Sequence, residues 1–326
     1  MILSALIKGK SILSLMELSP KEIEKILDLA IILKKEAKQG LFRKLLGDKV
    51  LAMIFQKPST RTRVSFDVTM LQLGGHAINL SSSELQLGRG ETIEDTARTL
   101  SRYVDAIMAR VYSHEDVVGL ARASSVPVIN GLSDRYHPAQ ILADLQTLLE
   151  KKGKLKGLKV AWVGDGNNVC NTWLIGAASM GIDLSVATPK DYRPLKEAID
   201  NAQRIAKDTG ARIKILDEPS IAVKDADCVI TDSIVSMGFD HEREKRLKIF
   251  LPKYQVNHEL MNKAKKDAVF MHCLPAKRGE EVTDDVINGP KSFVWDEAEN
   301  RLHSQKALLC HLVLDENEIF RNLSHS

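Results

Sequence analysis

The sequence predicts an α/β protein with two doubly wound parallel-sheet domains joined by interdomain helices. Short apolar runs of strand length alternate with longer segments whose apolar residues recur at helical spacing, which is typical of parallel α/β sheets. The alternation starts again after residues 151–157, which are rich in lysine and glycine and are typical of a domain boundary. With 326 residues, the chain is long enough for two domains with separate cores.

The first half of the chain carries clear start and stop signals for its elements. Ser19, Pro20 and Glu22 predict a helix that begins with a capping box, and Gly40 ends that helix. A second helix is expected to follow the polar turn at residues 59–62 and to stop at Gly74. Further strands are expected at 50–55, 76–80, 106–111 and 126–130, and further helices at 92–100 and 137–150.

The second half repeats this pattern. A glycine-bearing turn at residues 164–168 separates a strand from a helix that ends at Met180. The final segment, 315–326, is polar and is expected to be loosely ordered. Strands are expected at 160–163, 183–187, 228–232 and 269–273, and a late helix at 300–314.

Composition excludes several classes of protein. The net charge of +3 is small for this length, so it gives no indication of nucleic-acid or membrane binding. No apolar run approaches the roughly 20 residues of a membrane span, and no signal or transit peptide is recognised. The four cysteines are scattered and lack metal-type pairing, which fits a reducing, cytoplasmic location.

A polar stretch at residues 58–63 joins the first strand to the next helix. Pro58 fixes the backbone just before the turn. Amide N–H groups at a helix start, with two hydroxyl and two guanidinium groups, form a suitable site for a phosphate. The alternative is an ordinary serine N-cap beside solvated arginines. The candidate phosphate ligands are Ser59, Thr60, Arg61 and Thr62.

Two further candidate positions lie in the first half. Arg110 and Tyr112 end a strand, where ligands of parallel sheets bind, although a structural salt bridge would also explain the arginine. His137 opens a helix, and a neutral imidazole there could donate a hydrogen bond to a carbonyl oxygen. Gln140 follows one helical turn later, so both side chains can face one point. A helix cap or a surface position would also explain the histidine.

In the second half, polar residues again follow strands. Asp232 ends a strand and precedes Ser236, although a turn or helix cap would also explain it. Cys273 follows His272, which raises the possibility of a cysteine–histidine nucleophile. Adjacent residues of a strand point to opposite faces, which disfavours that possibility.

A dinucleotide site is a further alternative, because Gly164 and Gly166 follow a strand. The fingerprint is incomplete: Val169 occupies the position of the third glycine, and the next strand ends without an acidic residue to hold a ribose. We therefore do not expect NAD to bind.

Residues 58–63 resemble the carbamoyl-phosphate loop of the carbamoyltransferases. Further stretches follow in the order of that family, and the resemblance covers nearly the whole chain; the last three resemble its ornithine-specific members. These stretches are 109–112, 137–140, 164–168, Asp232 with 236–238, and 272–275.

The resemblance implies a transferase that moves the carbamoyl group of carbamoyl phosphate to the δ-amine of L-ornithine, giving L-citrulline and phosphate. Such a reaction serves arginine biosynthesis or the catabolic arginine deiminase pathway, and the motifs leave the direction open. The implied domains are a carbamoyl-phosphate-binding domain at 1–150, an ornithine-binding domain at 151–299, and a C-terminal helix, 300–326, that returns to the first domain.

The resemblance also assigns roles to matching residues. It implies catalytic roles for Arg61, Arg110, His137, Asp232 and Cys273. It implies that ornithine is bound by Asn168, Asp232, Ser236 and Met237. It implies that carbamoyl phosphate is bound by Ser59, Thr60, Arg61, Thr62, Gln86, Arg110, His137, Gln140, Cys273, Leu274 and Arg301.

The family's assembly and cofactor use follow from the same resemblance. Gln86 lies in a polar loop that, in the family, reaches into the site of a neighbouring subunit, so a homotrimer or an assembly of trimers is expected. Neither a metal nor an organic cofactor is expected. The expected partners are the two small-molecule substrates and further copies of the chain, with no nucleic acid and no membrane.

Three positions depart from the family pattern. Ala139 replaces a common cysteine, Asn171 lies where histidine is frequent, and Ile234 replaces an aromatic residue. Ile234 is the largest departure, because it could loosen the loop or alter substrate fit. Alternative acceptors are aspartate, putrescine or an acetylated ornithine, and a non-enzymatic phosphate-binding or assembly protein is an alternative of another class.

Overall fold

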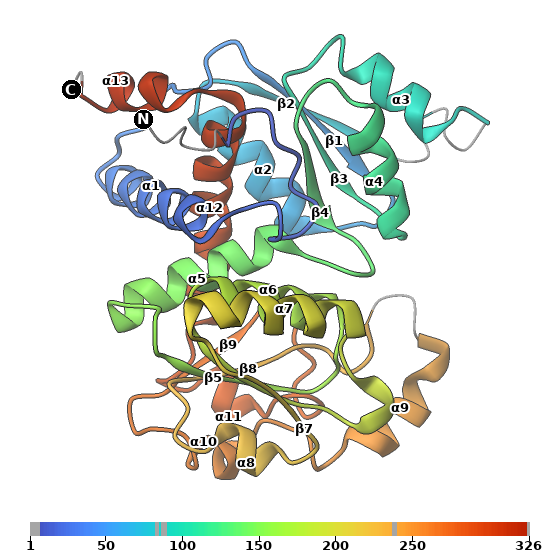
Figure 1. The fold of residues 1–326 in the computed structure, drawn as a ribbon, viewed down its shortest axis with the longest axis vertical. Coiled ribbons are helices and arrows are strands. Elements are labelled where there is room, and N and C mark those ends of the chain that lie inside the picture. The colour runs from blue at the N-terminus through green and yellow to red at the C-terminus, as the bar shows by residue number, and fades with distance from the viewer. Residues whose placement is uncertain (1–6, 82–84, 86–89, 237–239, 325–326) are drawn as a thin grey trace. The chain divides into compact units, whose positions relative to one another are not determined.

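The computed structural model describes residues 7–81, 85, 90–236 and 240–324. The chain divides into two compact units (Figure 1). The first unit comprises residues 1–146 and 300–326, and the second comprises 147–299. The chain thus passes between the units within two helices, α5 (Pro138–Lys152) and α12 (Val294–Val313).

The first unit contains a four-stranded parallel sheet with the order β2-β1-β3-β4. The chain leaves β1 for one edge and then returns to the other, so the order reverses between β1 and β3, as in doubly wound folds. The strands are β1 (Val50–Phe55), β2 (His76–Ser81), β3 (Ala106–Arg110) and β4 (Val128–Leu132). Its helices include α1 (Pro20–Lys38), α2 (Thr60–Gln72), α3 (Ile93–Leu100) and α4 (His114–Ala123).

The second unit contains a five-stranded parallel sheet with the order β7-β6-β5-β8-β9. The reversal lies between β5 and β8, and helices cover both faces (Figure 1), which confirms the predicted fold class. The strands are β5 (Lys159–Val163), β6 (Asp183–Ala187), β7 (Ile213–Leu216), β8 (Cys228–Thr231) and β9 (Val269–His272). The helices are α6 (Asn168–Ser179), α7 (Lys196–Thr209), α8 (Pro219–Val223), α9 (Arg243–Phe250), α10 (His258–Met261) and α11 (Asp284–Ile287).

Local sequence signals explain how several elements begin. The predicted capping box of α1 is present: the Ser19 hydroxyl accepts from the Glu22 N–H, and the Glu22 carboxylate accepts from the Ser19 N–H at 2.7 Å. In the first unit, α1 lies beside α12 (Figure 1), where Lys34 Nζ donates to Asn300 Oδ1 at 2.7 Å. This bond ties the start of the chain to its last long helix.

The predicted loose C-terminal segment is wrong for most of its length. Residues Glu316–Ser324 form helix α13. The Asp315 carboxylate accepts from the Glu318 N–H at 2.9 Å, and the Glu318 carboxylate accepts from the Asp315 N–H at 2.7 Å. This reciprocal cap stabilises a helix in a sequence that looks merely polar.

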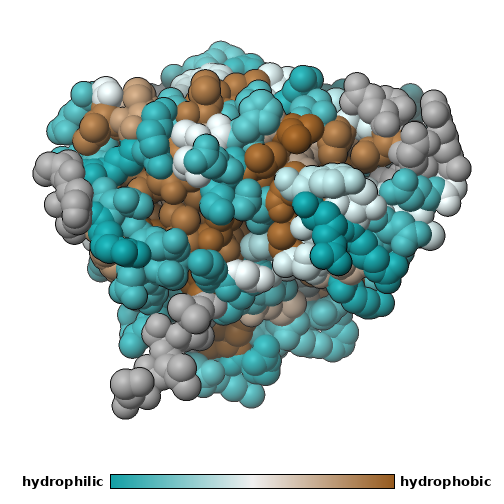
Figure 2. All heavy atoms as spheres, turned by 90° about the horizontal axis from the view of Figure 1, so that it is seen from above, coloured by the Kyte–Doolittle hydropathy of each residue, from teal (hydrophilic) through white to brown (hydrophobic). Residues whose placement is uncertain are grey.

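Some large apolar side chains of the first unit remain exposed. On α2, Phe66 and Met70 are buried, whereas Val64 is 53% and Leu71 is 68% exposed. Ile78 of the edge strand β2 is also exposed. We call Val64, Leu71 and Ile78 the α2–β2 set. Hydrophobic residues gather in patches among hydrophilic ones on the face drawn in Figure 2. Where such side chains form one large contiguous patch, they mark an interface between proteins.

Candidate functional site

The predicted phosphate turn lies between β1 and α2. Ser59 is the N-cap of α2, and its hydroxyl accepts from the Thr62 N–H at 3.2 Å. The serine cap that we considered as an alternative is therefore present, and the start of a helix is also a favourable position for an anion. Thr60 is exposed, Arg61 is half-buried and Thr62 is buried.

Arg301 of α12 connects this turn to α5. Its Nη1 donates to Gln140 Oε1 at 2.7 Å, and its Nη2 donates to Thr62 Oγ1 at 3.2 Å. The guanidinium is buried, with 3% of the residue exposed, so Arg301 is not a surface cation. Gln140 Nε2 donates to Asp144 Oδ1 at 2.8 Å, which directs the carbonyl oxygen of the amide toward Arg301.

Arg110 and His137 lie in the same region. Arg110 is the last residue of β3, opposite Phe55 at the end of β1, and is buried. His137 precedes α5 and is also buried. Burial, and next the guanidinium of Arg301, hold the pKa of His137 well below its ordinary value, and Arg110 and Arg61 lower it further. The imidazole is therefore neutral near pH 7 and can share a hydrogen bond with a ligand.

Lys57 is a buried cation that our sequence analysis missed. Its Nζ lies 4.6 Å from the centroid of the Tyr112 ring. Burial lowers the pKa of Lys57, the neighbouring Arg110 lowers it further, and Asp134 opposes the effect. The only sequence signal was its place between the first strand and the phosphate turn. We call Lys57, together with the predicted carbamoyl-phosphate ligands placed in the first unit, the cationic cluster. Those ligands are Ser59, Thr60, Arg61, Thr62, Arg110, His137, Gln140 and Arg301.

A second set of polar residues follows β8 and β9 in the other unit. The Cys273 thiol donates to Asp232 Oδ1 at 3.2 Å, and Asn167 Nδ2 donates to Asp232 Oδ2 at 2.7 Å. Asn167 is also the N-cap of α6, so Asn168 is the first residue of that helix. Sequence analysis missed Asn167, although it is the neighbour of the predicted Asn168. We call Asn167, Asn168, Asp232, Ser236, Cys273 and Leu274 the carboxylate cluster.

Not every predicted site residue is placed by these contacts. Ser236 is half-buried after β8 and Leu274 follows Cys273 with a positive φ of 57°. Gln86 and Met237 lie outside the described residues.

Ile234 and Asn171 are accommodated by their surroundings. Ile234 is fully buried in the core of the second unit, and its carbonyl oxygen accepts from Arg246 Nη1 at 3.1 Å. Asn171 is also buried, and its Oδ1 accepts from the Leu195 N–H at 2.9 Å. Neither departure leaves the neighbouring backbone unsupported.

Arg246 also pairs with Asp165 in the turn after β5. The Nη1 atom lies 2.9 Å from Asp165 Oδ2. Burial raises the pKa of Asp165 to about 6, although Arg246 opposes the rise, and Asp232 adds to it. The second unit thus holds two neighbouring carboxylates at the carboxyl ends of its inner strands.

His272 is held in one tautomer by its neighbours. Its Nδ1 accepts from the Leu274 N–H at 2.9 Å, so the ring proton lies on Nε2, which is 3.2 Å from Glu281 Oε1. A cysteine–histidine nucleophile is therefore not formed, because the Cys273 thiol donates to Asp232 and both ring nitrogens of His272 have other partners.

The contacts of Asp232, His272 and Cys273 also decide whether a metal ion can bind between these side chains. Ligand atoms of Asp232, His272 and Cys273 lie within 4.8 Å of one another. The Nδ1 lone pair of His272 is already used by the Leu274 N–H, and Nε2 carries a proton. Asp232 and Cys273 then remain, which is fewer than the three or four protein ligands of typical zinc sites.

The turn after β5 does not suit a dinucleotide. A Cβ atom at Gly166 would lie 2.2 Å from the backbone nitrogen of Pro194, and the Gly166 N–H donates to the Tyr192 carbonyl at 2.8 Å. In a dinucleotide fold, the corresponding glycine leaves room for a pyrophosphate. Here that space is filled by the chain itself.

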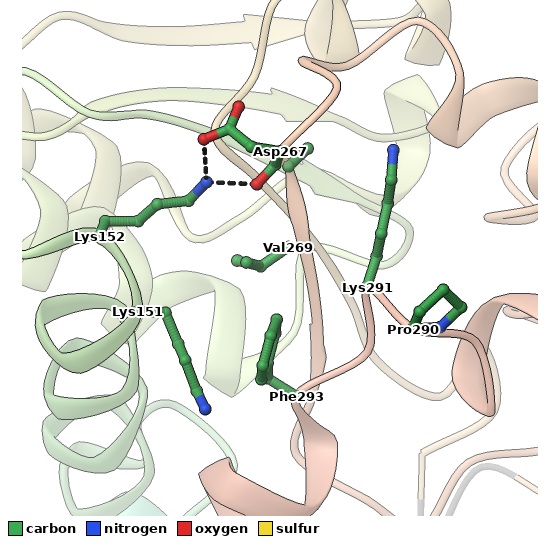
Figure 3. A pocket seen from close by; sticks show the side chains of 8 residues that line it. Lys151, Lys152, Asp267, Val269, Pro290, Lys291 and Phe293 are labelled. Carbon is green, nitrogen blue, oxygen red and sulfur yellow. Dashed lines mark hydrogen bonds and ion pairs between the residues drawn. The ribbon is translucent and has the colours of Figure 1, made fainter.

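A pocket of about 270 Å³ in the second unit is shown in Figure 3. Lys152 Nζ lies 2.9 Å from Asp267 Oδ2, and Lys151 Nζ lies 2.6 Å from Asp296 Oδ1. Lys151 and Lys152 thus have carboxylate partners that offset their charge, and Lys291 is the third lysine of the lining. The pocket is lined by Lys151, Lys152, Asp267, Ala268, Val269, Pro290, Lys291 and Phe293, at the beginning of β9 rather than at its carboxyl end.

Comparisons with known proteins agree in both halves of the chain. Residues 10–150 match the family model described as aspartate/ornithine carbamoyltransferase, carbamoyl-P binding domain. Residues 156–312 match the model described as aspartate/ornithine carbamoyltransferase, Asp/Orn binding domain. Within the described residues, no helix is both long and apolar enough to span a membrane.

Individual relatives are similar over almost their whole length. The chain is 58% identical to the ornithine carbamoyltransferase of Pyrococcus horikoshii, covering 94% of this chain and 96% of that one. It is 57% identical to the anabolic ornithine carbamoyltransferase of Pyrococcus furiosus, covering 92% and 95%. The solved structure of ornithine carbamoyltransferase from Pyrococcus furiosus has a TM-score of 0.92 at 56% identity, covering 94% and 98%. That from Gloeobacter violaceus has a TM-score of 0.83 at 42% identity, covering 94% and 99%.

We expect the His137 ring to stay neutral at pH 7 and through the range in which an ordinary histidine titrates, because its pKa is held well below the ordinary value of about 6.5. The unfolded chain takes up a proton at this residue below about pH 6.5 and the folded chain does not, so this residue makes the protein less stable as the pH falls through that range. Nitrogen-15 NMR of histidine-labelled protein measures the ring, and His137→Gln assigns its signal. Protonation of His137 with a midpoint above pH 6 contradicts the expectation.

Proposed function

Because the chain belongs to the aspartate/ornithine carbamoyltransferase family, we propose that it transfers the carbamoyl group of carbamoyl phosphate to the δ-amine of L-ornithine. The products are L-citrulline and phosphate. The observation that carries the choice of ornithine is the Asp232 carboxylate, held by Asn167 and Cys273 at the end of β8. A carboxylate there suits an acceptor with an ammonium group and disfavours one with an additional carboxylate.

Carbamoyl phosphate binds, in this proposal, to the cationic cluster. The helix N–H groups and Arg61 bind the phosphate, and the buried cations near them supply the positive charge that a dianion requires. Arg110, His137 and Thr62 contact the carbonyl oxygen, and Gln140 accepts from the carbamoyl NH₂ group. Arg301, Cys273, Leu274 and Gln86 complete the proposed ligands, the last of these from a neighbouring subunit.

Ornithine binds to the carboxylate cluster. Asp232 pairs with the α-ammonium group, and the backbone at Ser236 and Met237 takes the α-carboxylate. Asn168 contacts the same end of the amino acid. Cys273 orients the acceptor; its thiol already donates to Asp232, which supports a binding role rather than a nucleophilic one.

The reaction is an acyl transfer. The neutral δ-amine attacks the carbonyl carbon of carbamoyl phosphate, a C–N bond forms, and negative charge develops on the carbonyl oxygen. Arg110, Thr62 and the neutral His137 stabilise that charge by donating hydrogen bonds. The C–O bond to phosphate then breaks and its electrons leave with the phosphate, while the attacking nitrogen loses a proton. Arg61 and the helix N–H groups stabilise the leaving phosphate.

We propose a homotrimer as the active assembly, located in the cytoplasm. The exposed apolar side chains of the α2–β2 set support an interface on the first unit. For the direction of flux we propose arginine biosynthesis, since one of the similar relatives is named as anabolic.

An amine-acceptor panel tests the substrate. We expect carbamoyl phosphate and ornithine to give citrulline, and the other acceptors to give little product. Putrescine and N-acetylornithine lack the free α-ammonium group that pairs with Asp232, aspartate brings a second carboxylate, and the side chain of lysine is one methylene longer. Carbamoylated products are quantified by mass spectrometry. A main product from another amine would keep the chemistry and change the acceptor. Absence of product from every acceptor with folded, oligomeric protein would favour a non-enzymatic role.

Replacing Arg61 tests the phosphate turn. We expect Arg61→Gln to lower kcat at least about 100-fold, a typical loss for one donor that stabilises transition-state charge, without unfolding the protein. Arg63→Gln, in the same turn but exposed, is the matched control and should retain most activity. A near-normal rate for Arg61→Gln, measured by citrulline formation beside a circular dichroism spectrum, would refute this role.

Replacing Leu71 tests the assembly. We expect Leu71→Asp to convert the trimer to monomers and to reduce activity, because a charge enters an apolar interface and the loop of Gln86 loses its neighbour. Ile221→Asp is the control, since Ile221 is 63% exposed on α8 of the other unit. Light scattering after size-exclusion chromatography measures the assembly. A fully active monomer would disprove the shared site.

A further inference from the structure

Gln56 makes three hydrogen bonds at the carboxyl edge of the first sheet. Its N–H donates to the Arg110 carbonyl at 2.9 Å, its Oε1 accepts from the Tyr112 N–H at 2.8 Å, and its Nε2 donates to Asp116 Oδ2 at 2.8 Å. The residue is half-buried and lies between β1 and the phosphate turn. Its backbone and side chain therefore connect three elements: β1, the end of β3 and the start of α4.

These bonds act where the sheet ladder ends. The last partners of β1 and β3 are Phe55 and Arg110. Beyond these residues the two segments of the chain separate. The segment after β1 leads to the Ser59–Thr62 turn, and the segment after β3 leads to α4. Gln56 is the next residue after Phe55. It bonds to the carbonyl of Arg110 and to the N–H of Tyr112. We call the three hydrogen bonds of Gln56 the clamp. The clamp fixes the spacing between β3, which ends at Arg110, and the phosphate turn.

The clamp also supports a neighbouring cation. Gln56 holds the backbone N–H of Tyr112, and the ring of the same residue lies 4.6 Å from Lys57 Nζ. Lys57 and Arg110 are both buried, so a shift of either backbone would change how these positive charges meet an anion.

We propose that Gln56 is a positioning residue for carbamoyl phosphate, acting through Arg110 and Tyr112 on the cationic cluster. This inference rests on the proposed function, because it takes the anion to be carbamoyl phosphate. Gln56 does not touch the substrate; it sets the distance between groups that do.

The amide is suited to this task because it offers one donor and one acceptor. A carboxylate at this position would still accept from the Tyr112 N–H but would face Asp116 without a proton to share. Two carboxylates at hydrogen-bond distance repel, so the bond to α4 would be lost. Exchanging the donor and acceptor roles of positions 56 and 116 restores the hydrogen bond between them, because an asparagine at position 116 can donate to a glutamate at position 56.

The test uses Gln56→Glu, Asp116→Asn and the double variant Gln56→Glu/Asp116→Asn. We expect Gln56→Glu to weaken the binding of carbamoyl phosphate about tenfold and to leave the KM for ornithine within about twofold of wild type. The double variant, whose net charge equals that of wild type, is expected to recover to within about threefold. Gln39→Glu, an exposed position after α1, is the matched control and should change neither substrate.

Two readouts separate this inference from the proposed function. Calorimetry measures binding of carbamoyl phosphate, and of inorganic phosphate as a stable probe, without turnover; steady-state kinetics gives the KM of each substrate. Binding that weakens in Gln56→Glu and recovers in the double variant supports the inference, even if the amine acceptor is not ornithine. Unchanged anion binding in Gln56→Glu, equal loss for both substrates, or no recovery in the double variant would overturn it.

Discussion

The buried guanidinium of Arg301 is the interaction on which the first site depends. It joins Thr62 on α2 to Gln140 on α5 from a helix more than 150 positions away in the chain. A buried cation is stable only when its donors meet acceptors, so these three elements must pack in one arrangement. That arrangement positions the phosphate turn and fixes the amide of Gln140. After burial, the charge of Arg301 is the largest cause of the lowered pKa of His137.

The two units carry opposite local charge. In the first unit, burial and then neighbouring cations lower the pKa values of Lys57 and His137. In the second unit, burial and then the nearby Asp232 raise the pKa of Asp165 despite Arg246. In the proposed function, the carbamoyl donor, a dianion, binds beside the cations of the first unit, and the ammonium group of the acceptor binds beside the Asp232 carboxylate of the second.

Local signals allowed much of the fold to be predicted, whereas contacts across the sheet could not be predicted from the residues alone. The Ser59 cap and the capping box at Ser19 lie within a few positions of the groups that they bind. The bond from Asn167 to Asp232, by contrast, requires β5 and β8 to be neighbours, which is decided by strand order. Arg301 illustrates the same limit, because its burial depends on helices that are distant in sequence. The domain roles and site roles therefore remain proposals, while the doubly wound fold is confirmed.

The replacement of an aromatic residue by Ile234 leaves the surrounding loop supported. Its side chain is fully buried among the apolar residues of the second unit, and its carbonyl is held by Arg246, which also pairs with Asp165 in the turn after β5. The loop is thus fixed by core packing and by its backbone, neither of which requires an aromatic ring. In our proposal, the groups that select the amine are the Asp232 carboxylate and its two hydrogen-bond donors, Asn167 and Cys273. These bonds do not involve the Ile234 side chain, so in our proposal the charge at Asp232, and not the shape of residue 234, governs the choice of acceptor.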